Sequence, residues 1–163
     1  MVDHEYMLQF AEAGHRVLNK LLALNSPVRE ELVEENRAGG YLCVADMRGE
    51  PIMVIGLGDF DPERRALQFE FCQEKVARLA QFPSHRRSME SRNKEAGQYG
   101  GALRGDRFLA SFSGFPEGLD EVIAGIALCR NGNLTFTQLS EILSDNEYVA
   151  RLGENWLFGV FQS

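Results

Sequence analysis

The residues best suited to bind a ligand lie in one irregular segment near the middle of the chain. Residues 84–101 are polar and show almost no apolar periodicity, which in a compact domain is typical of a functional or disordered connection. The basic side chains of this segment are His85, Arg86, Arg87, Arg92 and Lys94. Such groups suit a carboxylate or phosphate, so the segment is a candidate anion site. A solvated loop with a short helical turn is the simpler explanation of the same charges, and both interpretations stay open.

Ser113 is a second candidate ligand contact. It precedes Gly114 at a point where a strand is expected to turn into a helix, and a nucleophile could stand there. No histidine lies nearby in the sequence to act as its base, and a Ser–Gly pair in this place is more often only a turn. The chain also lacks the Gly-x-Ser-x-Gly, His-Glu-x-x-His, P-loop and zinc-ligand patterns. We therefore assign no metal ligand, and the catalytic residues are unknown.

Composition limits the classes of partner. The 163 residues are 44% hydrophobic and 25% charged, which fits one domain with a sizeable core. The formal net charge is -7, and phosphate backbones require a supply of Lys and Arg, so a nucleic-acid partner is not expected.

The cysteines and the apolar runs indicate a cytoplasmic protein. Cys43, Cys72 and Cys129 are widely spaced within apolar stretches, so we expect buried, reduced thiols rather than disulfides or metal ligands. The chain begins with an acidic stretch, not a signal peptide, and no apolar run is long enough to span a membrane.

The first half of the chain predicts helices followed by a hairpin. Apolar residues from Tyr6 to Leu24 recur at helical spacing, and Ser26-Pro27 starts a second helix that Gly39-Gly40 is expected to end. Two strands, 41–47 and 52–57, are joined by the turn 48–51. A third helix is expected to begin at Asp61-Pro62-Glu63 and to end at Pro83.

The second half predicts another hairpin, a buried helix and a small tail. Strand 102–104 should turn through Gly105-Asp106 into a strand that carries Phe108, Ala110 and Phe112 on one helix-covered face. Pro116 suits the first turn of the next helix, which runs to Cys129. Two short helices, near 138–143 and 145–152, should follow, with possible capping boxes at Thr135/Gln138 and Ser144/Glu147. The apolar end, 156–161, is expected to add a strand or to cover a neighbouring chain.

These elements predict an α+β fold in which helices pack on a central antiparallel sheet. We expect a single domain, 1–163, in which N-terminal helices occupy 1–40, the core sheet and helices 41–130, and a C-terminal extension 131–163.

Two blocks of sequence stand out within Tyr41–Leu128. The first is Tyr41-Leu-Cys-Val-Ala-Asp-Met-Arg-Gly-Glu-Pro-Ile, followed by a helix with Lys75-Val-Ala77. The second is Gly100-Gly-Ala, followed by Ala-Ser-Phe-Ser-Gly-Phe-Pro-Glu-Gly-Leu-Asp-Glu-Val-Ile-Ala-Gly. Together they resemble the GlcG/HbpS-like family of haem-binding and glycolate-operon proteins, and the chain departs from the family pattern at Phe115-Pro116.

The resemblance implies a profilin-like fold and a homo-oligomer. Some relatives bind haem, so haem is a cofactor by resemblance only, and this chain shows no matching ligand motif. The leading hypothesis is a cytoplasmic, oligomeric protein that binds haem or an anionic metabolite. The alternatives are an enzyme acting on a small organic acid and a structural interaction protein.

Overall fold

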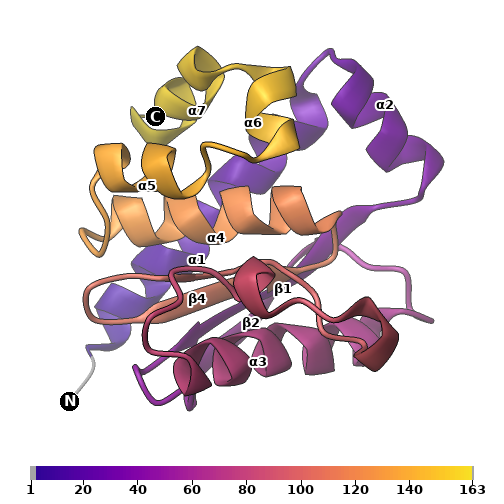
Figure 1. The fold of residues 1–163 in the computed structure, drawn as a ribbon. Helices are drawn as coiled ribbons and strands as arrows, with labels where there is room; N and C mark the ends of the chain where they lie inside the picture. The colour runs from indigo at the N-terminus through magenta and orange to yellow at the C-terminus, as the bar shows by residue number, and fades with distance from the viewer. Residues whose placement is uncertain (1–2, 163) are drawn as a thin grey trace.

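The computed structural model describes residues 3–162 (Figure 1). Its helices are α1 (His4–Ala23), α2 (Pro27–Glu34), α3 (Arg65–Gln81), α4 (Glu117–Arg130), α5 (Phe136–Ile142), α6 (Glu147–Leu152) and α7 (Glu154–Gln162). Its strands are β1 (Ala38–Ala45), β2 (Pro51–Asp59), β3 (Ala102–Arg104) and β4 (Leu109–Ser113). Two 3₁₀ turns, η1 (Ser88–Ser91) and η2 (Lys94–Ala96), lie in the basic segment.

The strands form one antiparallel sheet in the order β2-β1-β4-β3. The two hairpins meet through β1 and β4, where Leu42 lies opposite Phe112 and Tyr41 opposite Ser113. This pairing places the residue that ends β4 beside the centre of the sheet. The predicted α+β class, with helices on an antiparallel sheet, is confirmed.

Helices cover both faces of the sheet, as Figure 1 shows, with α3 below it and α4 and α1 on the other side. Phe108, Ala110 and Phe112 belong to the large apolar cluster on the α1–α4 side, so their predicted shared face is confirmed. Leu109 packs with Cys72 and Val76 in a smaller cluster on the α3 side. The alternation of side chains along a strand therefore serves two cores.

The C-terminal helices form a further layer against α4 and α1 (Figure 1). The expectation that 156–161 adds a strand is wrong, because these residues lie within α7. Leu157 and Val160 are buried in the cluster shared with α1 and α4, and Arg130 donates a hydrogen bond to the carbonyl of Phe161. A helix lets this apolar segment bury one side on the chain's own core.

The end of α2 corrects the expected role of Gly39-Gly40. Both glycines lie in β1, and α2 ends at Glu34, followed by Asn36 in the left-handed region with φ 55°. A Cβ on Gly40 would lie 2.3 Å from the carbonyl oxygen of Ser113. The glycines are therefore needed for close strand packing rather than for a helix stop.

Two other predicted boundaries shift. The connection between β3 and β4 spans residues 105–108, not Gly105-Asp106 alone, and the N–H of Gly105 bonds to the carbonyl of Phe108. Residues 61–64 form a turn, in which Asp61 accepts a hydrogen bond from the N–H of Glu63, so α3 begins later, at Arg65.

In the tail, the capping box at Thr135/Gln138 is confirmed, whereas α6 is capped by Asn146 rather than by Ser144.

The three cysteines are free and buried, as expected. That they stay reduced in the cell remains a prediction. Across residues 3–162 we find no helix with the length and apolar character needed to cross a bilayer.

Candidate functional site

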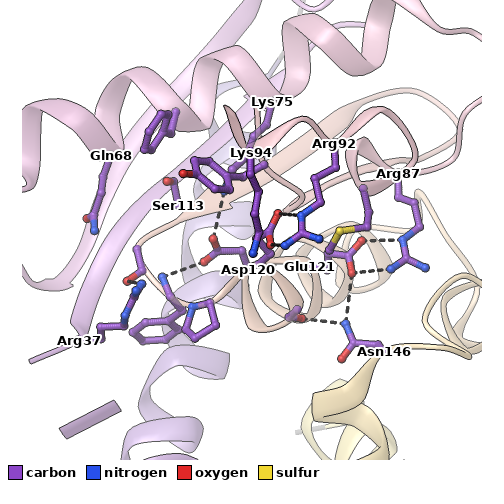
Figure 2. Close-up of a pocket in the computed structure, with 18 of the residues that line it drawn as sticks. Arg37, Gln68, Lys75, Arg87, Arg92, Lys94, Ser113, Asp120, Glu121 and Asn146 are labelled. Carbon is purple, nitrogen blue, oxygen red and sulfur yellow. Dashed lines mark hydrogen bonds and ion pairs between the residues drawn. The ribbon is translucent and has the colours of Figure 1, made fainter. Parts of the chain in front are cut away.

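A cavity of about 710 Å³ lies where α3, the basic segment and the turn between β4 and α4 meet (Figure 2). The beginning of α6 closes one side through Asn146 and Glu147. The turn between β4, which ends at Ser113, and α4, which starts at Glu117, consists of residues 114–116. All three of these residues line the cavity.

One side of α3 and the turn before it line the cavity. Arg64, Gln68, Phe71 and Lys75 follow one another at spacings of three or four residues, which brings them onto one face of the helix. At 1.5 Å per residue this row extends for roughly 16 Å. The row begins at the partly exposed Arg64 and ends at the buried Lys75, so the cavity extends along α3.

The buried end of the row is an ion pair. The Nζ of Lys75 lies 3.0 Å from Oδ2 of Asp120 and donates a second hydrogen bond, of 2.8 Å, to the carbonyl of Phe112. Oδ1 of Asp120 accepts a 2.9 Å bond from the N–H of Phe115. Gly101 makes room for this pair, since a Cβ there would lie 2.7 Å from the lysine nitrogen.

Burial changes the acidity of the carboxyls on α4. It raises the pKa of Asp120 to about 7, although Lys75 and the N–H of Phe115 favour the ionised form. Burial also raises the pKa of Glu121, against the opposing effect of Arg87. Asp120 is therefore a buried group whose charge changes near neutral pH.

Arg87 fastens the basic segment to α4 and to the C-terminal helices. Its Nε and Nη2 lie 2.7 and 2.9 Å from the two carboxylate oxygens of Glu121. Its Nη1 bonds to Asp145, whose pKa this contact lowers. Asn146 donates to the carbonyl of Gly118 and to Glu121, which joins α6 to the same network.

Arg92 makes a second attachment. Its Nε and Nη2 lie 2.9 and 2.6 Å from the two carboxylate oxygens of Glu117, which also accepts a bond from the N–H of Gly100. Beneath the segment, the buried Arg78 bonds to Ser91 and to the carbonyls of Ser88 and Tyr99. The basic segment is therefore held by specific contacts at both ends.

Arg64, Gln68, Lys94 and Ser113 line the cavity, and their side chains form no hydrogen bond or ion pair with another residue of 3–162. Ser113 is 3% exposed and Gln68 is 8% exposed, and neither side chain is joined to a neighbour by a dashed line in Figure 2. Buried polar groups are normally hydrogen-bonded, so these two are available to a ligand. The carboxylate of Glu147 also lines the cavity, at the α6 side.

The structure places the sequence candidates unevenly. Arg87, Arg92, Lys94 and Ser113 line the cavity, whereas His85 and Arg86 do not. The ring of His85 stacks on Phe82 with centroids 4.8 Å apart, and its Nδ1 lies 3.9 Å from a carboxylate oxygen of Glu90. Of the lining candidates, the two arginines are already paired with carboxylates.

The residues that sequence reasoning missed come mainly from α3. Arg64, Gln68 and Lys75 interrupt an apolar helix at helical spacing, and that interruption is the signal that could have marked a functional face. Asp120 lies in the first turn of α4, where an acidic residue is favoured by the helix dipole alone, and nothing in the sequence places Lys75 beside it.

The lining does not fit haem. The lining residues, all of which lie within 3–162, include no His or Cys. Most of the charged side chains in the lining are held in ion pairs with one another. Met89 and Tyr99 are lining side chains of types that can ligate haem iron, but Met89 packs against Gly100 and Tyr99 against Phe71. In the described residues, no three His, Cys, Asp or Glu side chains gather as a metal site.

Comparison with known proteins supports the fold. No family model and no curated protein matches this chain. The chain is similar to a solved structure, the crystal structure of Klebsiella pneumoniae protein ORFY, a protein assigned to the family DUF336. The two chains are 14% identical and superpose with a TM-score of 0.51, over 82% of this chain and 92% of that chain. The likeness establishes a shared fold.

Proposed function

We propose that this chain is a binding protein of the GlcG-like family, to which DUF336 belongs, and that it holds a small organic anion in the cavity along α3. Two lines support membership of the family: the sequence blocks within Tyr41–Leu128 and the shared fold. The proposed ligand is a carboxylate or a similar anion, not haem.

One observation carries the proposal. Arg64 and Lys94 are lining cations without an ion-pair partner in residues 3–162, while Lys75, Arg87 and Arg92 are each paired with a carboxyl group. Ser113 and Gln68 add buried hydrogen-bonding groups that an anion can use. Positive charge and unused donors on one wall are what a bound carboxylate needs.

A thermal-shift experiment tests the charge requirement. Benzoate and acetate should raise the melting temperature, because a ligand that binds only the native state stabilises it, whereas the neutral benzamide and acetamide should not. The shift should disappear in the variant Arg64→Ala/Lys94→Ala. The matched control is Arg86→Ala, which removes a charge from the same segment but outside the cavity. Equal shifts with acids and amides would contradict the proposal.

An enzyme acting on a small organic acid is the second candidate, and Asp120 favours it. A carboxyl whose pKa is about 7 at the wall of a cavity is suited to general acid catalysis. The test is to incubate the protein with each acid that binds and to follow it by proton NMR. Conversion that is lost in Asp120→Asn but kept in Arg86→Ala would support an enzyme, and unchanged spectra would exclude it for those acids.

We also propose that the protein is a homo-oligomer in the cytoplasm. Phe69 on α3 is 42% exposed, and the outer edge of β2 pairs with no described strand. A second copy would remove such apolar surface from water. Light scattering at micromolar concentration should give at least a dimer mass, and Phe69→Asp should lower it. Val33→Asp, at an exposed apolar position on α2, is the control. A monomer mass for the unmodified protein would refute this.

A further inference from the structure

The cavity has an aromatic wall as well as a charged one. The rings of Phe71 and Tyr99 lie with centroids 5.3 Å apart at an angle of 73°, and both residues line the cavity. Both are only partly buried, and Leu67 and Met89 extend the same apolar lining. An acid as small as acetate would leave this wall in contact with water.

The apolar and polar groups alternate along one helix face. On α3, Phe71 follows Gln68 by three residues, and Gln68 follows Arg64 by four. Arg64 and Phe71 are therefore separated by roughly 10 Å along the helix axis. A ligand that contacts both needs a charged end and a rigid apolar body, and the hydroxyl of Ser113 in the cavity lining offers a further polar contact.

We propose that the anion is an aromatic carboxylic acid with a second hydrogen-bonding substituent. Its carboxylate binds Arg64 and Lys94, its ring packs against Phe71 and Tyr99, and the substituent bonds to Ser113. This assignment rests on the proposed anion site. It is favoured over a longer aliphatic acid because aromatic rings gain from edge-to-face contact beyond the area that they bury.

Calorimetric titration with four probes tests the assignment. The expected order of affinity is 4-hydroxybenzoate, then benzoate, then acetate, with phenol weaker than benzoate. Phe71→Leu keeps an apolar side chain but removes the ring, so it should weaken both aromatic acids by about two- to tenfold and leave acetate unchanged. Ser113→Ala should remove the advantage of 4-hydroxybenzoate over benzoate.

The outcomes separate this inference from the proposed function. If acetate binds as tightly as benzoate, the aromatic assignment is overturned while the anion site stands. If phenol binds as tightly as benzoate, or no acid binds, the anion site itself is overturned. Tyr99→Leu repeats the ring test independently of Phe71→Leu, and circular dichroism shows whether each variant is folded.

Discussion

The two faces of the sheet are built differently. On the side of α1 and α4, large apolar residues such as Phe10, Phe112 and Ile123 fill the interface and are fully buried. On the side of α3, the apolar cluster is small, and the buried side chains beside it include Lys75, Arg78 and Ser111. The first face supplies packing and the second accommodates charge, and the cavity lies where α3 meets the basic segment and the beginning of α4.

The largest expected effect comes from breaking the buried ion pair. At a pH above 7, where Asp120 is ionised, Lys75→Ala should lower the free energy of unfolding by about 3–5 kcal/mol, because it leaves the Asp120 carboxylate buried without its cation. Urea denaturation measures this loss. Lys20→Ala, in the last turn of α1 where the side chain is partly exposed, should change stability by less than about 0.5 kcal/mol. A similarly small loss for Lys75→Ala would mean that the α3 face does not depend on its charges.

The next effect is a pH dependence. Because the folded pKa of Asp120 is raised, to about 7 from 3.8, its contribution to stability is complete below pH 3.8 and is lost as the pH rises to 7. The free energy of unfolding relative to Asp120→Asn should therefore fall between pH 5 and 7, by up to about 1.4 kcal/mol per pH unit, and level off above pH 8. Parallel pH profiles for both proteins would contradict the raised pKa.

The smallest effect belongs to the α4 side. Ile123→Val removes one buried methylene-sized group and should cost about 0.5–1.5 kcal/mol. It should leave the affinity for benzoate unchanged, because Ile123 does not line the cavity. A change in affinity larger than twofold in this variant would show that the two faces are not independent.

The sequence predicted the layers of the fold well because they follow from apolar periodicity. The alternation at Phe108, Ala110 and Phe112 and the helical spacing in α4 are local patterns that tertiary packing preserves. Helix and strand ends were less predictable. Gly39-Gly40 has the composition of a helix stop, yet the decisive interaction is with the carbonyls of β2 and β4, far along the chain.

The candidate site could be predicted only in part, because it too depends on contacts between residues that are far apart in the sequence. A cluster of basic residues signals an anion, but which of them remain free depends on carboxylates placed by the fold. Glu117 and Glu121 lie more than twenty residues from Arg92 and Arg87. Their pairing leaves Lys94 as the available cation that the segment places at the cavity. Arg64 belongs to another element, and only the packing of α3 on the sheet brings it to the cavity.

Isothermal titration of benzoate tests the central claim most directly. The unmodified protein and Arg86→Ala should bind it with the same affinity, while Arg64→Ala/Lys94→Ala should bind at least tenfold more weakly, because each lost charge-assisted hydrogen bond contributes about 1.5–3 kcal/mol. All three proteins should unfold at similar urea concentrations, since exposed charges contribute little to stability. Equal affinities in all three would show that the cavity along α3 is not an anion site.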